Sequence, residues 1–309
     1  MTILDKTISG IGDLDLRLMI EAQSRLDNLT KPQGSLGRLE ELAKLLVGIT
    51  KNKNPNFKNK VILTLASDHG VVEEGVSAFP QEVTPQMVYN FLNGGAAINV
   101  LARHVGARVV IIDSGISSDL KPYQDLIAKK VDYGTKNMTK GPAMTKEEAI
   151  TAIENGIEVF GDEFKKGIDI IGTGDMGIGN TTSSSAITSV ITGSSVENIT
   201  GRGTGVDDKV YTNKIKVIKK ALEVNKPDPH DPLDVLAKVG GFEIAGLCGV
   251  ILAASAKRIP VVIDGFISSA AALIAYQLAP KTKNYMIAAH LSQEQGHKII
   301  LHHIGLKPL

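Results

Sequence analysis

The chain has little of several features that mark particular classes of protein. Cys248 is its single cysteine, so no intramolecular disulfide can form, and its apolar surroundings fit core packing in a reducing compartment. The 34 basic and 33 acidic side chains nearly cancel, and neither sign forms a long run. A nucleic-acid partner would usually need a basic stripe, so none is expected. Tandem repeats and low-complexity tracts are also absent.

Targeting and membrane segments are lacking as well. Residues 1–15 have neither the basic nor the apolar region of a signal peptide, so a cytoplasmic location is expected. The one membrane-like run, 261–280, is interrupted by Asp264 and Gly265 after a β-branched segment. A buried strand, a loop and an alanine-rich helix explain this run better than a transmembrane span, and no membrane partner is expected.

The hydrophobic pattern predicts an α/β fold. Short β-rich runs end in polar or glycine turns and alternate with helical patterns; the runs are 61–66, 109–112, 168–171, 261–263 and 285–289. This alternation favours right-handed βαβ units, and therefore a Rossmann-like parallel sheet with helices on both faces. Ligands of such sheets bind beyond the carboxyl ends of the strands, where these polar turns lie.

Two amphipathic helices are expected before the first β-run. They cover residues 14–29 and 36–49 and precede a connection rich in Lys, Asn and Pro at 51–60. We therefore predict a helical segment, 1–55, ahead of a Rossmann-like catalytic domain, 56–280.

A glycine-rich stretch, 172–182, follows the predicted strand 168–171 and precedes a segment, 183–191, that can be read as a helix. Its glycines permit close approach of a ligand, and the N–H groups at a helix start favour an anion such as phosphate. Asp175 lies inside this stretch. Because a carboxylate is a poor choice for holding phosphate, Asp175 invites a different role.

The same glycines also match a dinucleotide fingerprint, Gly172-x-Gly174-x-x-Gly177, which makes a nicotinamide oxidoreductase an alternative. That fingerprint requires a second strand ending in an acid about 20 residues later. The residues at that distance, 192–197, end in a glutamate without a β-run before it. The oxidoreductase is therefore disfavoured.

A second glycine loop, 201–205, precedes a lysine-rich helix at 208–222. With Arg202 and Lys214, the two glycine loops would suit one phosphate monoester. Tight turns beside a solvated helix explain the same pattern equally well.

Other chemistries have weaker support. Four histidines near the end, His290, His297, His302 and His303, have no carboxylate or cysteine at the usual ligand spacing, so no metal is expected. A Ser-His-Asp hydrolase would want a Gly-x-Ser-x-Gly turn, which is missing.

Residues 77–87 could meet a flat heteroaromatic ligand. Ser77 and Phe79 combine a hydroxyl group with an aromatic face, although loop packing is the commoner role for an aromatic residue beside proline. Thr84, followed by proline, predicts a helix N-cap, which puts Gln86 and Met87 in the first turn.

The order of motifs resembles the nicotinate-nucleotide:dimethylbenzimidazole phosphoribosyltransferase family of cobalamin synthesis. The matching stretches span nearly the whole chain: 29–37, 68–71 with 74–80, 174–182, 238–243, 264–266 and 290–292. The resemblance implies transfer of phosphoribosyl from nicotinate mononucleotide to 5,6-dimethylbenzimidazole, without cofactor or metal. It also implies a homodimer and a small domain built from both chain ends, so that 281–309 would hold the last strand and the start of its C-terminal part.

The resemblance assigns roles to residues at the matching positions. Asp175 would be catalytic, and Ser77, Phe79, Gln86 and Met87 would surround the base. The phosphoribosyl group would lie against the two glycine loops, with Lys214 a weaker candidate: Gly174, Met176, Gly177, Gly179, Asn180, Thr181, Gly201, Arg202, Gly203, Thr204, Gly205 and Lys214.

Two departures from the family pattern bear on catalysis. Asp175 stands where relatives can have glutamate, so its reach is one methylene shorter. The pattern also continues past residues 304–309 into an Arg-Leu-Gly-Glu-Gly segment whose glutamate is the principal general base. We expect that the sequence is part of a longer chain that carries this glutamate. The alternative is a nucleotide- or benzimidazole-binding protein without turnover.

Overall fold

A computed structural model of residues 1–309 contains a six-stranded sheet in which all neighbouring strands are parallel. The strand order β3-β2-β1-β4-β5-β6 confirms the predicted Rossmann-like α/β fold. The strands are β1 (Lys60–Ser67), β2 (Ala107–Gly115), β3 (Leu126–Ala128), β4 (Ile170–Met176), β5 (Val261–Ile263) and β6 (Met286–Ala288).

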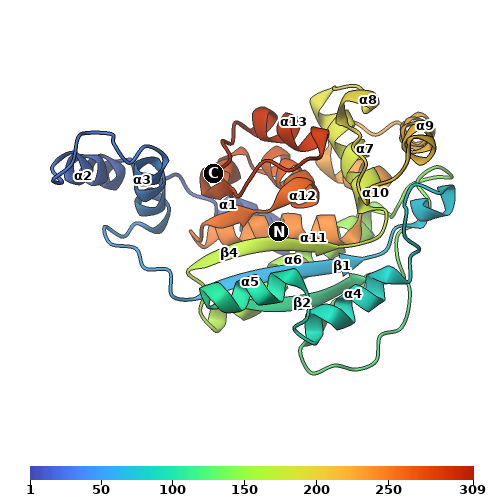
Figure 1. Ribbon diagram of the computed structural model, residues 1–309, viewed down its shortest axis with the longest axis horizontal. Helices are drawn as coiled ribbons and strands as arrows, with labels where there is room; N and C mark the ends of the chain where they lie inside the picture. The colour runs from blue at the N-terminus through green and yellow to red at the C-terminus, as the bar shows by residue number, and fades with distance from the viewer.

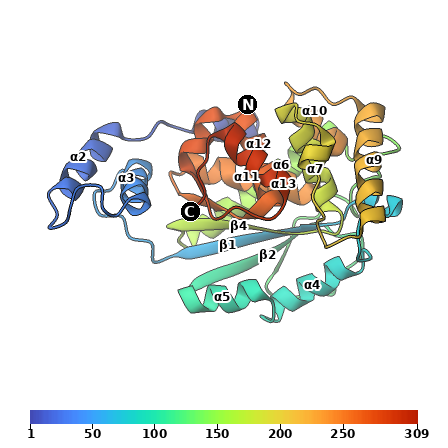
Figure 2. The same ribbon diagram turned by 45° about the horizontal axis from the view of Figure 1, so that its top comes forward.

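Helices cover both faces of this sheet (Figure 1, Figure 2). On one face lie α4 (Val83–Leu92) and α5 (Ala97–Val105), and on the other lie α6 (Lys146–Lys165) and α11 (Phe242–Ala256). The other α-helices are α1 (Ile3–Ser9), α2 (Leu16–Asp27), α3 (Arg38–Thr50), α7 (Asn180–Thr192), α8 (Val196–Ile199), α9 (Asp208–Asn225), α10 (Pro232–Val239), α12 (Gly265–Leu278) and α13 (Gln295–Ile304), and short 3₁₀ helices span Gly70–Glu74 and Pro280–Tyr285. None of these helices has both the length and the apolar character that crossing a membrane requires.

The predicted strand 168–171 is longer than expected and corrects the extent of the first glycine loop. β4 runs through Gly172 and Gly174 and ends at Met176. Glycine fits inside this strand because its neighbour β1 comes close: a Cβ on Gly174 would lie 2.7 Å from Oγ1 of Thr64. β5 has the predicted ends, whereas the three-residue strand β3 was not predicted.

The core between the sheet and the second helical layer depends on α11, whose residues are nearly all buried. Cys248 lies within it, fully buried as predicted. The backbones of α6 and α11 approach closely where glycines meet, since a Cβ on Gly156 would lie 1.9 Å from the carbonyl oxygen of Gly246. This packing places Glu243, in the first turn of α11, below the carboxyl ends of the strands.

The helices α2 and α3 form an arm that extends away from the sheet, beyond the amino ends of its strands (Figure 1). Arg258, which precedes β5 and has a left-handed backbone (φ 58°), attaches this arm. Its guanidinium donates to the carbonyl oxygens of Ile49 (2.7 Å), Gly48 (2.8 Å) and Asp13 (3.0 Å). One side chain therefore holds the end of α3 and the segment entering α2.

The two chain ends meet both parts of the molecule. Within the predicted segment 1–55, α1 lies apart from the arm and packs against α6 and α11. Near the other end, the carbonyl oxygen of Lys307 accepts a hydrogen bond from Arg38 of α3 at 2.9 Å. The division into a small and a large domain stays a prediction.

Candidate active site

The carboxyl ends of β1 and β4 lie where the strand order reverses direction. β2 and β3 continue on one side of β1, and β5 and β6 continue on the other side of β4. Open α/β sheets bind ligands at this position. Asp68 and His69 follow β1, Asp175 lies near the end of β4, and Asp264 follows β5. The polar turns seen in the sequence therefore meet at one edge of the sheet.

After β4 the chain turns through Gly177 and Gly179 into α7. Gly179 has a φ of 96°, and no side chain caps the helix, so the positive end of its dipole faces the site. A Cβ on Gly177 would lie 2.3 Å from the carbonyl oxygen of Ser67, which explains the glycine. The predicted N-cap role of Thr84 is wrong: α4 begins at Val83, and the Thr84 hydroxyl instead accepts the N–H of Ile178 at 3.2 Å.

A fully buried ion pair lies beside this turn. Nε2 of His69 is 2.7 Å from Oε1 of Glu243, and Nδ1 of His69 is 3.1 Å from Oγ of Ser183. Burial opposes protonation, but the charge and hydrogen bond of Glu243 raise the pKa of His69 above its ordinary value. A Cβ on Gly241 would lie 2.4 Å from Cε1 of His69, so the pair fills the space between two glycine turns.

Asp175 is held by two hydrogen-bond donors. Asn180 Nδ2 donates to its Oδ1 at 3.1 Å, and Ser268 Oγ donates to its Oδ2 at 3.3 Å. Burial and the nearby charges of Glu243 and Asp264 raise the pKa of Asp175 from 3.8 to about 7. Near neutral pH this carboxyl group exists in both protonated and ionised forms, which suits proton transfer or charge stabilisation.

The second glycine loop approaches the first through Lys214 and Thr181. Lys214, on α9, is 1% exposed; its Nζ donates to Oγ1 of Thr181 at 2.8 Å, and burial lowers the pKa of Lys214 to about 8. Gly203 lies against this pair, and its N–H donates to Oε1 of Glu294 at 2.8 Å. An ammonium group, a hydroxyl group and a glycine backbone therefore converge, as the two-loop interpretation expected.

Arg202 is directed elsewhere in this structure. Its guanidinium pairs with Asp208 and donates to the carbonyl oxygen of Val206 at 2.8 Å. Phosphate binding by Arg202 would therefore require this pairing to be released.

The predicted base-binding residues lie on two elements. The loop holding Ser77 and Phe79 contacts the second glycine loop, because the N–H of Ala78 donates to Oγ1 of Thr204 at 3.2 Å. Phe79 is 50% exposed. Gln86 is exposed and Met87 half-buried on α4.

A cavity of about 360 Å³ opens beside Asp175, between the sheet and the α4–α5 layer. It brings together residues to which sequence reasoning gave no role: Thr64, Phe91, Ile98, Thr173, Asp264, Phe266, Ile267 and His290. Asp264 and His290 form a pair, with 3.3 Å between Oδ1 and Nδ1. Both follow predicted strands, and that position was the one signal in the sequence that could have indicated them.

Comparison with known proteins gives the same grouping along the whole chain. A family described as phosphoribosyltransferase matches residues 11–309. The chain belongs to this family. The nicotinate-nucleotide–dimethylbenzimidazole phosphoribosyltransferases of Desulforudis audaxviator (strain MP104C) and Geobacter sulfurreducens (strain ATCC 51573 / DSM 12127 / PCA) are 59% and 55% identical over 309 residues, which is 100% of this chain and 88% of each relative. The crystal structure of CobT from Thermus thermophilus is 41% identical, with a TM-score of 0.92 over 95% of this chain and 88% of that one.

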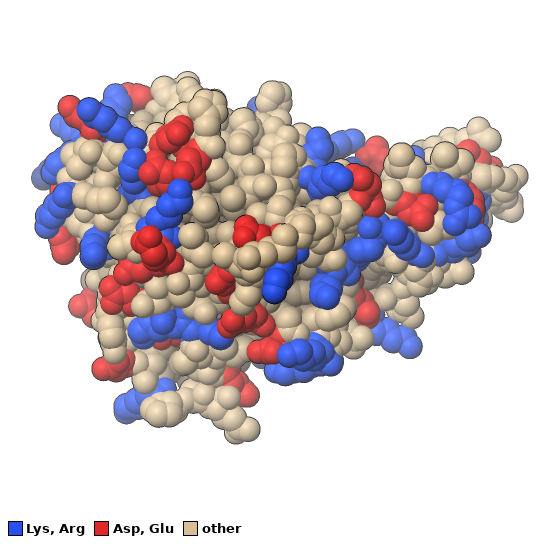
Figure 3. Space-filling view, turned by 180° about the vertical axis from the view of Figure 1, so that it is seen from behind, with Lys and Arg blue, Asp and Glu red and all other residues tan.

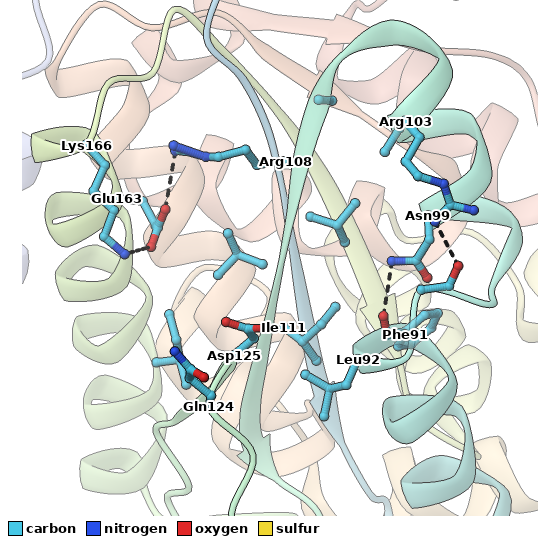
Figure 4. A pocket seen from close by; sticks show the side chains of 16 residues that line it. Phe91, Leu92, Asn99, Arg103, Arg108, Ile111, Gln124, Asp125, Glu163 and Lys166 are labelled. Atoms are coloured by element: carbon cyan, nitrogen blue, oxygen red, sulfur yellow. Dashed lines mark hydrogen bonds and ion pairs between the residues drawn. The ribbon is translucent and has the colours of Figure 1, made fainter.

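A larger cavity in this phosphoribosyltransferase, about 450 Å³, lies along the amino-terminal half of β2 (Figure 4). Its charges are already paired, since Glu163 lies 3.3 Å from Arg108 and 2.5 Å from Lys166. It is therefore remote from the strand ends where the family's α/β sheet would bind a ligand. The face seen from behind carries both signs of charge interspersed, without a continuous basic stripe (Figure 3).

Proposed function

We propose that the chain transfers the phosphoribosyl group of nicotinate mononucleotide to 5,6-dimethylbenzimidazole, giving α-ribazole 5′-phosphate and nicotinate for the nucleotide loop of cobalamin. The observation that carries the proposal is Asp175, a carboxyl group with a pKa of about 7 between an anion-binding turn and a partly apolar cavity. Membership of the phosphoribosyltransferase family supports the same reaction class.

The phosphate is the part of the substrate with the clearest candidate partners. The start of α7 offers a helix N-terminus, and Lys214 offers a buried ammonium group beside Thr181 and Gly203. Helix dipole and ammonium both favour an anion, and burial strengthens their attraction because water screens them less. We propose that the residues of the two glycine loops hold the phosphate here.

The chemistry at C1′ of the ribose assigns a role to Asp175. The bond from C1′ to the pyridinium nitrogen breaks, and its electron pair stays on nicotinate. A nitrogen lone pair of the benzimidazole forms the new bond to C1′, and the other ring nitrogen loses its proton. We propose that the Asp175 carboxylate stabilises the positive charge developing at C1′, beside the general base that the family resemblance places after Leu309.

The test measures nicotinate released when the full-length protein meets nicotinate mononucleotide and a benzimidazole. Asp175→Asn is expected to lower turnover more than it weakens nucleotide binding, because a charge needed in the transition state is lost. Unchanged turnover would remove Asp175 from the catalytic residues. No release with several benzimidazoles, together with calorimetric binding, would favour the binding protein without turnover.

We also propose a homodimer in the cytoplasm. The arm exposes Leu16 (67%), Ile20 (71%) and Leu39 (65%), which supports burial of the arm against a second copy. The single buried cysteine supports a reducing compartment. Light scattering at micromolar concentration measures the mass, and a monomeric wild-type protein would exclude the dimer.

A further inference from the structure

The cavity beside Asp175 differs in charge from the candidate phosphate site. The ionisable residues that line it are Asp175, Asp264 and His290, and no lysine or arginine is among them. Carboxylates repel the phosphate and the carboxylate of nicotinate mononucleotide but attract groups that donate hydrogen bonds or carry positive charge. The hydroxyl groups of the ribosyl unit are groups of this kind.

The register of the sheet explains how this cavity forms. Thr64 on β1 pairs with Gly174 on β4, and Gly172 pairs with Val262 on β5. Asp264, two residues beyond Val262, is therefore the residue of the β5 side that comes level with Gly174. Because Gly174 has no side chain, space is left between Thr64 and Asp264.

Thr64 supplies an observation that points to a ligand. Its side chain is 3% exposed, it lines the cavity, and its Oγ1 has no hydrogen-bond partner within the chain. Buried hydroxyl groups in folded proteins normally have a partner. A bound molecule with a hydroxyl group would supply the missing one.

Asp264 supplies a second, independent observation. It occupies the N-cap of α12 but makes no side-chain hydrogen bond to the helix, although aspartate is a favoured N-cap because it usually makes that bond. Asp231 shows the usual arrangement at α10, where its Oδ1 accepts the N–H groups of Leu233 and Asp234 at 3.1 Å. The Asp264 carboxylate instead faces His290 across the mouth of the cavity.

We propose that Asp264, oriented by His290, binds the 2′- and 3′-hydroxyl groups of the ribosyl unit in this cavity, with the Thr64 hydroxyl as a second contact. The inference rests on the proposed phosphoribosyl transfer and assigns the subsite for the sugar. An acidic residue in nucleotide-binding sheets of this architecture often holds ribose hydroxyls. This placement sets C1′ beside Asp175 and directs the phosphate toward Lys214.

The test compares nicotinate mononucleotide with its 2′-deoxy and 3′-deoxy analogues, using calorimetry on the full chain. Asp264→Ala is expected to weaken binding of the ribonucleotide by about 10- to 100-fold, the effect of losing a hydrogen bond to a charged group. The same substitution should weaken binding of a deoxy analogue several-fold less, because one of the hydrogen bonds is already missing. Thr64→Val should weaken ribonucleotide binding in the same direction.

Asp231→Ala is the matched control because it also removes an N-cap aspartate. It should lower the melting temperature and leave nucleotide binding unchanged, whereas Asp264→Ala should weaken binding and keep the melting temperature. Asp264→Asn, which retains an N-cap residue, provides a second variant if the alanine variant folds poorly.

Equal weakening for the ribonucleotide and both deoxy analogues would overturn the proposal, and so would no weakening at all. If Asp264 were instead a proton acceptor, Asp264→Asn would lower turnover equally with every nucleotide and remove the acid limb of the pH–rate profile, which also overturns it. A wild-type protein that binds nucleotide but releases no nicotinate would refute the proposed reaction, while the calorimetric comparison would still decide the ribose subsite.

Discussion

Replacing Asp175 with asparagine should stabilise the protein at neutral and alkaline pH while it lowers turnover. The pKa of this carboxyl group is about 7 in the folded protein and 3.8 in its ordinary state. Below pH 3.8 the group is protonated in both folded and unfolded chains. As the pH rises toward 7, the unfolded chain ionises first, so the stability contributed by the buried, protonated carboxyl is lost, and the loss is complete above about pH 7.

The size of this effect follows from the shift in pKa. About three pKa units correspond to roughly 4 kcal/mol at 1.36 kcal/mol per unit. Asp175 keeps partial contact with solvent, so we expect a net cost of roughly 2–4 kcal/mol at pH 8. Asparagine has nearly the same shape and no charge to bury, so the variant avoids this cost.

Urea unfolding followed by far-ultraviolet circular dichroism at pH 4.5, 6, 7 and 8 measures the difference between wild type and variant. The variant's advantage should grow with pH up to about 7 and then stay constant. Asp231→Asn is a control of opposite sign, because the hydrogen bond from Lys146 lowers the pKa of Asp231, and its loss should destabilise the protein as the pH rises. An Asp175→Asn difference that does not vary with pH would refute the assignment of the raised pKa.

Three further predictions concern helix packing, the phosphate site and the buried ion pair. Gly156→Ala should cost about 2–3 kcal/mol because its Cβ would meet a carbonyl oxygen of α11 at 1.9 Å, whereas Gly161→Ala on the same helix, with open space around it, should gain about 0.5–1 kcal/mol; urea unfolding compares them, and equal effects would contradict the close packing. Because the pKa of Lys214 is about 8, affinity for inorganic phosphate should fall between pH 7 and pH 9, and Lys214→Met should remove this dependence in calorimetry; a variant that keeps the wild-type dependence would exclude Lys214. Glu243→Gln leaves His69 without its charged partner and should cost about 3–5 kcal/mol in the same unfolding assay, so wild-type stability would argue against the ion pair.

The strands could be predicted where buried β-branched runs stand between sharp breaks. β5 illustrates this, since Val261–Ile263 lies between Pro260 and the Asp264–Gly265 turn. β4 shows the limit of the method. Glycine usually indicates a turn, so the sequence places Gly172 and Gly174 in a loop, but in the sheet they lie inside a strand because side chains of β1 occupy the space beside them. That neighbour is known only once the sheet has formed.

The candidate site divides in the same way. The anion-binding turn and Asp175 could be predicted because they lie close together in the chain. The ion pair of His69 with Glu243 could not, since 174 residues separate the partners. Asp264 was overlooked for a different reason: an aspartate before a helix is explained locally as an N-cap, and only the structure reveals that it makes no capping bond.

Arg258 has a consequence for any assembly that uses the arm. The carbonyl oxygens that it binds belong to Asp13 at one end of the arm and to Gly48 and Ile49 at the other. The guanidinium thus closes the arm into a loop with both ends fixed, and the hairpin of α2 and α3 becomes a lever with a set angle instead of a swivelling tether. A lever that is preorganised in this way loses less entropy when a partner engages it, so a side chain far from its tip contributes to the affinity there.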